Sequence, residues 1–270
     1  MNRNAPIGIF DSGIGGLTVA HAIRESLPYE SFVYFGDTAH LPYGDKSPAA
    51  IRHYAARITG FLLSQGAKII VIACNTASAH AYQTVLDICG PQVPVVNVID
   101  PVVNRILSRH AKGKIGVIGT KGTIASRIYP RKIEGANPEL KVASRATPLL
   151  ASMIEEGYFN NRISETIIHN YLNYNALKDL DALILGCTHY PLIRREVESF
   201  YRSKNVDIVD SGECVAEEVK GLLKAKKLNA SEGSLVSSVF YVSDRTAAFE
   251  NSTRTFFGEK IKLIEARIWE

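Results

Sequence analysis

Short apolar runs recur along the chain, separated by longer segments in which apolar residues return every three or four positions. Several of these runs are apolar throughout rather than alternating with polar residues, which is typical of strands covered on both faces of a parallel sheet. The resulting βαβα order predicts a doubly wound α/β architecture. The predicted strands cover residues 7–10, 32–35, 69–73, 93–98, 115–118, 140–143, 182–185, 206–209, 239–242 and 261–264, and helix-length segments cover 17–27, 48–65, 77–89 and 163–177.

The two halves of the chain share a pattern. The run GIF at residues 8–10 and the run GVI at 116–118 each lead into a glycine-containing turn. Further along each half, an apolar run ends in a cysteine, Cys74 or Cys187, that is followed by a polar pair. We therefore expect two related α/β domains, the first formed by residues 1–98 and 214–270 and the second by 99–213. In such sheets ligands bind beyond the carboxyl ends of the strands.

Composition and charge narrow the function classes. The 270 residues are 46% hydrophobic and 21% charged, and 31 basic residues against 27 acidic ones leave a net charge of +4 that is spread along the chain. This balance predicts neither nucleic-acid nor membrane binding. No apolar stretch approaches the ~20 residues that span a bilayer, and the opening MNRNAPIGIF lacks a signal-peptide pattern. We expect a cytoplasmic protein whose cysteines are thiols, and the absence of any CxxC pair or histidine ligand spacing predicts no metal site.

The strand-end cysteines are the main candidates for chemistry. Each stands where a strand runs out and a helix begins, so that backbone N–H groups and the helix dipole favour its thiolate. Two such groups on opposite sides of a carbon atom could remove a proton from one face and return one to the other, which inverts a stereocentre. Either cysteine alone could equally be a packed core residue. Cys89 and Cys214 lack the strand-end context, and we interpret them as packing residues.

Two loops of the first half could line a small pocket. The turn Asp11-Ser-Gly-Ile-Gly-Gly lies between a strand and a helix and exposes N–H groups that can bind an anion. It is not a P-loop, because no GK[ST] follows, and this favours a carboxylate over a phosphate. Asp11 could tune a nearby base or bind an ammonium group, or could simply cap the helix. Pro42 and Gly44 around Tyr43 predict a fixed, closely approaching backbone, with a plain surface loop as the alternative.

The second half offers an acid–base partner for its cysteine. His189 lies two residues after Cys187 and could orient, protonate or screen the thiol. Glu155 and Glu156 precede Gly157 at a predicted helix end, where the dipole disfavours a carboxylate. That mismatch predicts a special role for one of the two, and the sequence leaves open which one.

Parts of the sequence also fit two other function classes. The tripeptide D-S-G occurs at Asp11 and again at Asp210, as in the aspartic proteases, where two carboxylates share a proton. That chemistry belongs to an all-β fold, whereas helical patterns follow both tripeptides here. A non-catalytic amino-acid-binding module also fits a two-domain α/β chain, but such a module has no need of matched thiols.

The motifs GIFDSGIGGLTV, YFGDTAHLPYG, ACNTASA, VIGTKGT, EEG and LILGCTHYPL, in this order and spacing, resemble the glutamate racemases. The resemblance spans residues 7 to 212. ACNTAS and GCTHYPL are specific to the amino-acid racemase superfamily, and DSGIGG and PYG favour the glutamate branch over the aspartate branch, which is the alternative. The chain departs from many members at His40, where they have arginine, and at Thr147-Pro148, where they have Cys-Pro.

The resemblance implies a fold and a reaction. The fold would be two pseudo-symmetric, doubly wound, mainly parallel-sheet α/β domains with the active site in the cleft between them. The enzyme would interconvert L- and D-glutamate without cofactor or metal, supply D-glutamate for peptidoglycan, and form a homodimer.

The resemblance also implies residue roles. Cys74 would take the α-proton from D-glutamate with the help of Asp11, and Cys187 would take it from L-glutamate with the help of His189 and Glu156. The implied substrate-binding residues are Asp11, Ser12, Pro42, Tyr43, Gly44, Asn75, Thr76, Thr120, Thr123, Thr188 and His189.

Overall fold

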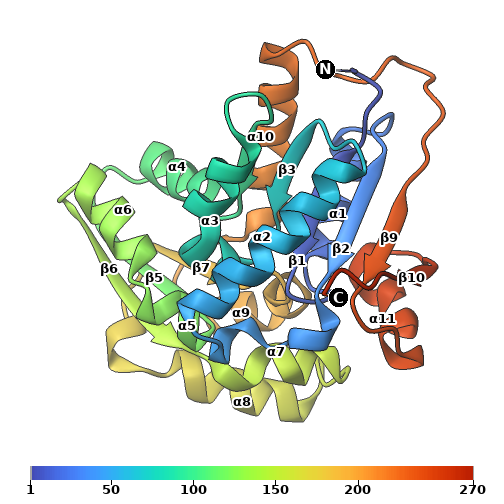
Figure 1. The fold of residues 1–270 in the computed structure, drawn as a ribbon. Coiled ribbons are helices and arrows are strands. Elements are labelled where there is room, and N and C mark those ends of the chain that lie inside the picture. Colours follow the sequence, from blue (N-terminus) through green and yellow to red (C-terminus); the bar gives the residue numbers. More distant parts are fainter. Residues whose placement is uncertain (1, 270) are drawn as a thin grey trace. The chain divides into compact units, whose positions relative to one another are not determined.

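The computed structural model describes residues 2–269, which form two compact units, each with its own parallel sheet (Figure 1). The first unit holds the chain up to Val98 and again from Gly212 onward, and the second unit holds Ile99–Ser211.

The sheet of the first unit has six strands in the order β10-β9-β2-β1-β3-β4. Every pairing in it is parallel, with Phe10 of β1 in register with Phe35 of β2 and Ile72 of β3. The strands are β1 (Ile7–Asp11), β2 (Phe32–Gly36), β3 (Ile69–Ile72), β4 (Val95–Asn97), β9 (Val239–Val242) and β10 (Leu263–Glu265).

Helices cover both faces of this sheet. Every second residue of a strand points to one face of the sheet. On one face these residues, among them Phe10 of β1 and Phe35 of β2, pack under α2 and α3, which run side by side in Figure 1. On the opposite face, Phe240 of β9 contacts Phe257 of α11, and α11 lies against α1. Burial on both sides explains why these strands are continuously apolar. The helices are α1 (Leu17–Ser26), α2 (Pro48–Ser64), α3 (Asn75–Cys89), α10 (Ser211–Ala225) and α11 (Ala247–Phe257).

The sheet of the second unit has four parallel strands in the order β6-β5-β7-β8. Its strands are β5 (Gly113–Gly119), β6 (Leu140–Ala146), β7 (Ala182–Gly186) and β8 (Asp207–Val209). Its helices are α4 (Asp100–Arg109), α5 (Lys121–Ala125), α6 (Ile128–Ala136), α7 (Pro148–Glu155), α8 (Arg162–Leu172) and α9 (Arg194–Phe200).

The two sheets repeat one topology. The order β2-β1-β3-β4 in the first unit matches β6-β5-β7-β8 in the second. In both, the chain leaves the first strand to one side and returns on its other side, so that a topological switch point lies between β1 and β3 and between β5 and β7. Such switch points are where open α/β sheets bind ligands. The predicted fold class, two similar α/β units with parallel sheets, is confirmed.

The predicted elements differ from the observed ones mainly at their ends. The helix expected to reach residue 177 ends at Leu172, where Asn173 caps it and a short 3-10 turn follows. All four cysteines are free thiols, as expected. Over residues 2–269, no helix is both long enough and apolar enough to cross a membrane. In the same described part of the chain, no three His, Cys, Asp or Glu side chains gather as a metal site would require.

Candidate active site

The glycine turn after β1 is organised around the carboxylate of Asp11. One oxygen, Oδ2, accepts hydrogen bonds from the backbone N–H groups of Gly13 (3.1 Å) and Gly16 (2.9 Å). The side chain is buried. Asp11 therefore stabilises the turn through one oxygen, a role close to the capping alternative that the sequence left open.

Two glycines are required here by close packing. A Cβ on Gly16 would lie 2.6 Å from the Cβ of Asp11, and a Cβ on Gly36 would lie 2.3 Å from the carbonyl oxygen of Gly13. Both distances are below any real contact of this kind. The end of β2, at Gly36, and the start of α1, at Gly16, thus lie so close to the turn that no side chain fits at either position, and only glycine is tolerated there.

Cys74 occupies the N-cap position of α3, two residues after β3 ends at Ile72. Its sulfur accepts a hydrogen bond from the backbone N–H of Ala77 (3.4 Å), and its S–H donates to Ser12 Oγ (3.7 Å). The thiol is buried, and Asn75 and Thr76 are buried in the first turn of the same helix. The structure thus brings together Ser12, Cys74, Asn75 and Thr76 at the switch point of the first sheet.

The pKa of Cys74 runs against the expectation from the sequence. Burial raises it, and the negative charge of Asp11 raises it further, so that the pKa reaches about 12. The hydrogen bonds from Ala77 and Ser12 lower it, but by less. The hydrogen bonds at the helix terminus do stabilise the thiolate, but burial and the charge of Asp11 destabilise it more. Cys74 is therefore a thiol in the resting enzyme.

The loop after β2 carries Tyr43, which is also buried. Its hydroxyl donates to Oδ2 of Asp37 at 2.6 Å. Burial and the neighbouring Asp37 raise the pKa of Tyr43, so that the phenol keeps its proton. Pro42 is exposed and Gly44 half-buried, on either side of this anchored ring.

Cys187 holds the corresponding position in the second unit. It directly follows β7, whose Gly186 pairs with Gly119 of β5, so that Thr120 and Cys187 leave adjacent strand ends. Cys187 and Thr188 are buried. Thr120 caps the short helix α5, accepting from the N–H of Thr123 at 3.2 Å and donating to its Oγ1 at 3.0 Å.

His189 links Cys187 to a carboxylate. Its Nδ1 lies 3.5 Å from the sulfur of Cys187, and its Nε2 lies 2.8 Å from Oε1 of Glu155 at the end of α7. Burial alone lowers the pKa of His189, but Cys187 and Glu155 together raise it well above its usual value. The ring therefore holds a positive charge at neutral pH, between a sulfur and a carboxylate.

A second buried network supports this strand end. The hydroxyl oxygens of Tyr190 and Thr147 lie 2.6 Å apart, and Tyr190 also donates to the backbone carbonyl of Thr147 (3.2 Å). Thr147 in turn donates to the carbonyl of Gly119. Thr147 is thus a buried connection between β5 and the segment that follows Cys187, at the position where the chain departs from the common Cys-Pro pair.

Comparison with known proteins shows the family to which the chain is related. Residues 17–219 match the model of the Asp/Glu/hydantoin racemase family. A glutamate racemase of Geobacter metallireducens is 40% identical over 94% of this chain and 93% of its own length. The crystal structure of a glutamate racemase from Francisella tularensis in complex with D-glutamate superposes with a TM-score of 0.92, at 38% identity and 99% coverage of both chains.

The chain belongs to the Asp/Glu/hydantoin racemase family. It is an enzyme, an amino-acid racemase, and glutamate racemases are its relatives over nearly the full length. A further one, from Thermus thermophilus in complex with β-chloro-D-alanine, has a TM-score of 0.87 at 38% identity over 98% of both chains.

Within each unit the racemase gathers most of the residues that the sequence singled out. Asp11, Ser12, Cys74 and the first turn of α3 lie at one strand-end cluster, and Cys187, Thr188 and His189 lie at the other. Glu156 is exposed, and the carboxylate that contacts His189 belongs to Glu155. A role for Glu156 stays a prediction from the sequence.

The sequence did not assign a role to two residues of this site. Glu155 was recognised only as one of a pair, because a one-residue uncertainty in a helix end turns a side chain by about 100°. Asp37, which anchors Tyr43, lies within the YFGDTAHLPYG motif but was given no role. A buried acid directly after an apolar strand was the available signal, the same one that singled out Asp11.

Proposed function

We propose that this racemase interconverts L- and D-glutamate, using Cys74 and Cys187 as its two acid–base groups. The observation that carries the proposal is the repeated placement of a buried thiol. Each cysteine lies within two residues of the end of the strand beside the switch point, Cys74 after β3 and Cys187 after β7, and the order β2-β1-β3-β4 around the first matches β6-β5-β7-β8 around the second. The relatives named glutamate racemase support glutamate as the substrate.

The proposed reaction is a proton exchange at Cα. Starting from D-glutamate, the Cys74 thiolate takes the α-proton, and the Cys187 thiol gives its proton to the opposite face of the planar intermediate. L-glutamate reacts by the reverse sequence. An α-proton beside a carboxylate is a very weak acid, so fixed hydrogen-bond donors must offset the developing charge. Hydroxyls and amides at the strand ends, those of the half-buried Ser12 and of the buried Asn75, Thr76 and Thr188 among them, are placed to supply these donors.

Binding of the substrate would itself lower the pKa of Cys74. The Asp11 charge is one cause of the high Cys74 pKa, after burial. A substrate ammonium group bound near Asp11 would offset that charge, lower the pKa of Cys74 and make its thiolate more accessible. This gives Asp11 a role in binding and in basicity through the same carboxylate.

The experiment is a circular dichroism assay with L-glutamate, D-glutamate and L-aspartate, without added pyridoxal phosphate or metal. We expect both glutamate enantiomers to lose optical activity. In deuterated water, the product should carry deuterium at Cα before the remaining substrate does, because two different groups take and return the proton. Turnover of aspartate alone, or of glutamate only with an added cofactor, would reject the proposal.

The biological setting is part of the same proposal. We infer that the enzyme works in the cytoplasm as a homodimer and supplies D-glutamate for peptidoglycan. Depletion in the source cells should then cause lysis that external D-glutamate relieves. Light scattering coupled to size-exclusion chromatography should give twice the 29.6 kDa chain mass.

A further inference from the structure

The carboxylate of Asp37 is a buried hub directly after β2. Three side chains donate to it: His40 through Nδ1 (2.8 Å), Tyr43 through its hydroxyl (2.6 Å) and Ser243 through Oγ (2.8 Å). Its own backbone N–H donates to the carbonyl of Asp11 at 3.0 Å. Asp37 thus ties the loop that carries Tyr43 to the ends of three neighbouring strands: its carboxylate contacts the residue after β9, its backbone N–H contacts β1, and it directly follows β2.

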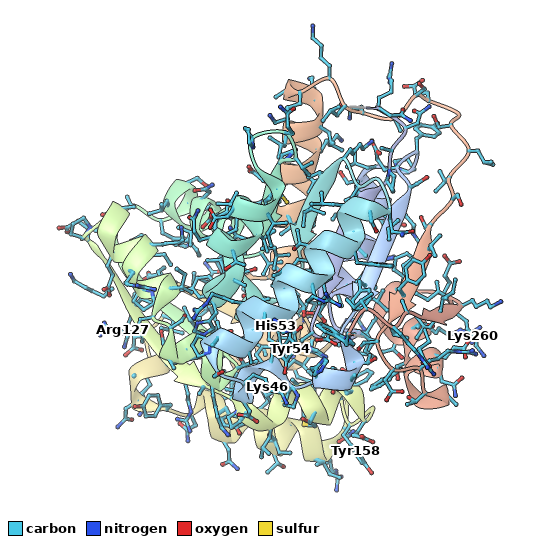
Figure 2. All side chains as sticks on the ribbon, in the orientation of Figure 1. Lys46, His53, Tyr54, Arg127, Tyr158 and Lys260 are labelled. Carbon is cyan, nitrogen blue, oxygen red and sulfur yellow. The ribbon has the colours of Figure 1, made fainter. Side chains whose placement is uncertain are left out.

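His40, one of the side chains bound to Asp37, is held in place by aromatic side chains. It stacks on Tyr54 of α2, with ring centroids 4.2 Å apart, and the ring of Trp269 meets it edge-on at 4.6 Å. Tyr54 and its neighbour His53 are labelled on α2 in Figure 2. Trp269 belongs to the segment after β10, which Arg57 anchors by donating from Nε to the carbonyl of Ile268 (3.1 Å). A C-terminal segment therefore braces a loop that lies more than 200 residues earlier in the chain.

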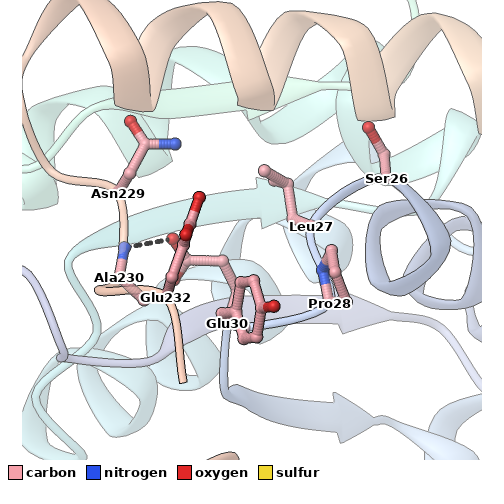
Figure 3. Close-up of a pocket in the computed structure, with 8 residues that line it drawn as sticks. Ser26, Leu27, Pro28, Glu30, Asn229, Ala230 and Glu232 are labelled. Carbon is pink, nitrogen blue, oxygen red and sulfur yellow. Dashed lines mark hydrogen bonds between the residues drawn. The ribbon is translucent and has the colours of Figure 1, made fainter. Parts of the chain in front are cut away.

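The amino end of β2 carries a contrasting buried carboxylate. Glu30 pairs with the buried ammonium of Lys68. It also accepts from the N–H of Ala230 at 2.8 Å, the hydrogen bond drawn in Figure 3. Lys68 also donates to the carbonyls of Arg3 and Leu228. These contacts join chain segments and involve no residue that the proposed reaction uses, so Glu30 serves stability alone.

Asp37 differs from Glu30 in what it holds. Two of its three donors, His40 and Tyr43, come from the loop itself, and Tyr43 stands between the exposed Pro42 and the half-buried Gly44 of the proposed substrate loop. A buried carboxylate is costly unless hydrogen bonds satisfy it. The loop therefore cannot leave its position without depriving this buried carboxylate of two hydrogen-bond donors, and the free energy of those two hydrogen bonds holds the loop in place.

We propose that Asp37 is a positioning residue for glutamate binding, which acts through the hydroxyl of Tyr43 and never touches the substrate. The proposal rests on the proposed function, because it takes residues 42–44 as part of the glutamate site. A loop that occupies its binding conformation only part of the time weakens apparent affinity by that fraction and leaves the chemistry of the bound complex unchanged.

The test compares Asp37→Asn, Tyr43→Phe and the double variant in the circular dichroism assay. Asp37→Asn should raise KM for both enantiomers roughly ten-fold, as expected if the loop is competent about a tenth of the time, and change kcat less than about three-fold. An amide keeps only one of the two acceptor oxygens, so the side chain in Asp37→Asn cannot accept from Tyr43 on one side and from His40 and Ser243 on the other at the same time. Because both single changes act on the same contact between residues 37 and 43, the double variant should be no worse than the poorer single one. Multiplying effects, or an unchanged KM in Asp37→Asn, would overturn the proposal.

Two matched controls separate positioning from stability. Glu30→Gln alters the other buried carboxylate flanking β2 and should lower the melting temperature without changing KM. Ser243 donates to Asp37 at one end of β9, whereas Ser238 accepts from the N–H of Phe32 at 3.1 Å at the other. Ser243→Ala should therefore raise KM about two- to three-fold, and Ser238→Ala should not. Equal KM values within either pair would contradict the proposal.

The contact between Trp269 and His40 allows a second test, in which the Asp37 carboxylate stays intact. Trp269→Ala should raise KM about two- to three-fold in the wild-type background and have no effect in the Asp37→Asn background. Wild-type enzyme that fails to racemise glutamate rejects the proposed function. Normal wild-type turnover with an Asp37→Asn variant that behaves like Glu30→Gln rejects only the positioning role.

Discussion

Cys74 and Cys187 hold equivalent places in two sheets of one topology, yet their proton environments differ. Cys74 lies near the carboxylate of Asp11, with Ser12 and the N–H of Ala77 as its hydrogen-bond partners. Cys187 lies beside Nδ1 of His189, and the carboxylate of Glu155 contacts the other ring nitrogen, Nε2. A negative charge faces one sulfur and a positive charge faces the other.

This difference shows how a symmetric fold can start a reversible reaction from one side. Burial, reinforced by the charge of Asp11, raises the pKa of Cys74 and keeps it a thiol in the resting enzyme. The charged ring of His189 places a proton and a positive charge next to Cys187. On the assignment that we propose, with Cys74 facing D-glutamate and Cys187 facing L-glutamate, the resting enzyme is arranged to receive L-glutamate. D-glutamate would first have to offset the charge of Asp11.

The largest effect should come from removing either thiol. Cys74→Ser and Cys187→Ser should each lower racemisation about 10³-fold or more, since an acid–base group typically contributes 10²–10⁴-fold. Each variant keeps one thiol, so each should still exchange the α-proton of one enantiomer with solvent. We expect Cys74→Ser to exchange only L-glutamate and Cys187→Ser only D-glutamate, measured by loss of the α-proton NMR signal in deuterated water.

Cys89 supplies the control for these variants. It is buried like the other two but lies at the end of α3, within the core under α2. Cys89→Ser should leave racemisation within about two-fold, because nothing near it takes part in proton transfer. Substantial racemisation by Cys74→Ser or Cys187→Ser would show that one thiol suffices. The difference between the two cysteine environments would then have no bearing on the reaction.

Asp11→Asn should separate the two effects of that carboxylate. The amide oxygen can still accept from Gly13 and Gly16, so the turn should survive. Removing the charge should lower the pKa of Cys74 from about 12, which thiolate absorbance near 240 nm can follow against pH, with Cys74→Ser as the blank. Racemisation should nevertheless fall about 10²-fold, because the substrate ammonium loses its partner. A lower Cys74 pKa with undiminished activity would leave Asp11 no role in binding.

The sequence predicted the sheets well and the contacts between distant segments poorly. Continuous apolar runs identify strands such as β1 and β7 because helices cover both faces, and the strand-end cysteines follow from those runs. The partners of Asp37 could not be predicted, because Ser243 lies some two hundred residues away and only the folded sheet places β9 beside β2. The pKa of Cys74 was mispredicted because the helix terminus is local in sequence, whereas burial and the approach of Asp11 are tertiary effects.

His189→Asn should affect the two directions unequally. Because the two enantiomers are equally stable, kcat/KM must remain the same for both directions, so the asymmetry can appear only in kcat and KM separately. We expect kcat from L-glutamate to fall about 10- to 100-fold, within the range for an acid–base partner, and kcat from D-glutamate to fall less. Equal losses of kcat in both directions would place His189 outside the proton path of Cys187.

Glu155 and Glu156 offer the smallest and sharpest test, because they are adjacent and chemically identical. Glu155 contacts His189 Nε2 at 2.8 Å from the last residue of α7, whereas Glu156 is exposed beyond the helix. Glu155 is one of the groups that raise the pKa of His189, so Glu155→Gln should lower that pKa, which NMR titration of the imidazole can follow. The more easily deprotonated ring then holds its charge beside Cys187 less well, and kcat from L-glutamate should drop about 3- to 10-fold, a modest share of the general-acid contribution. Glu156→Gln should leave the His189 titration where it is in the wild type. The opposite ranking would assign the special carboxylate to Glu156, as the sequence motif implies, and would mean that α7 shifts by one residue when substrate binds.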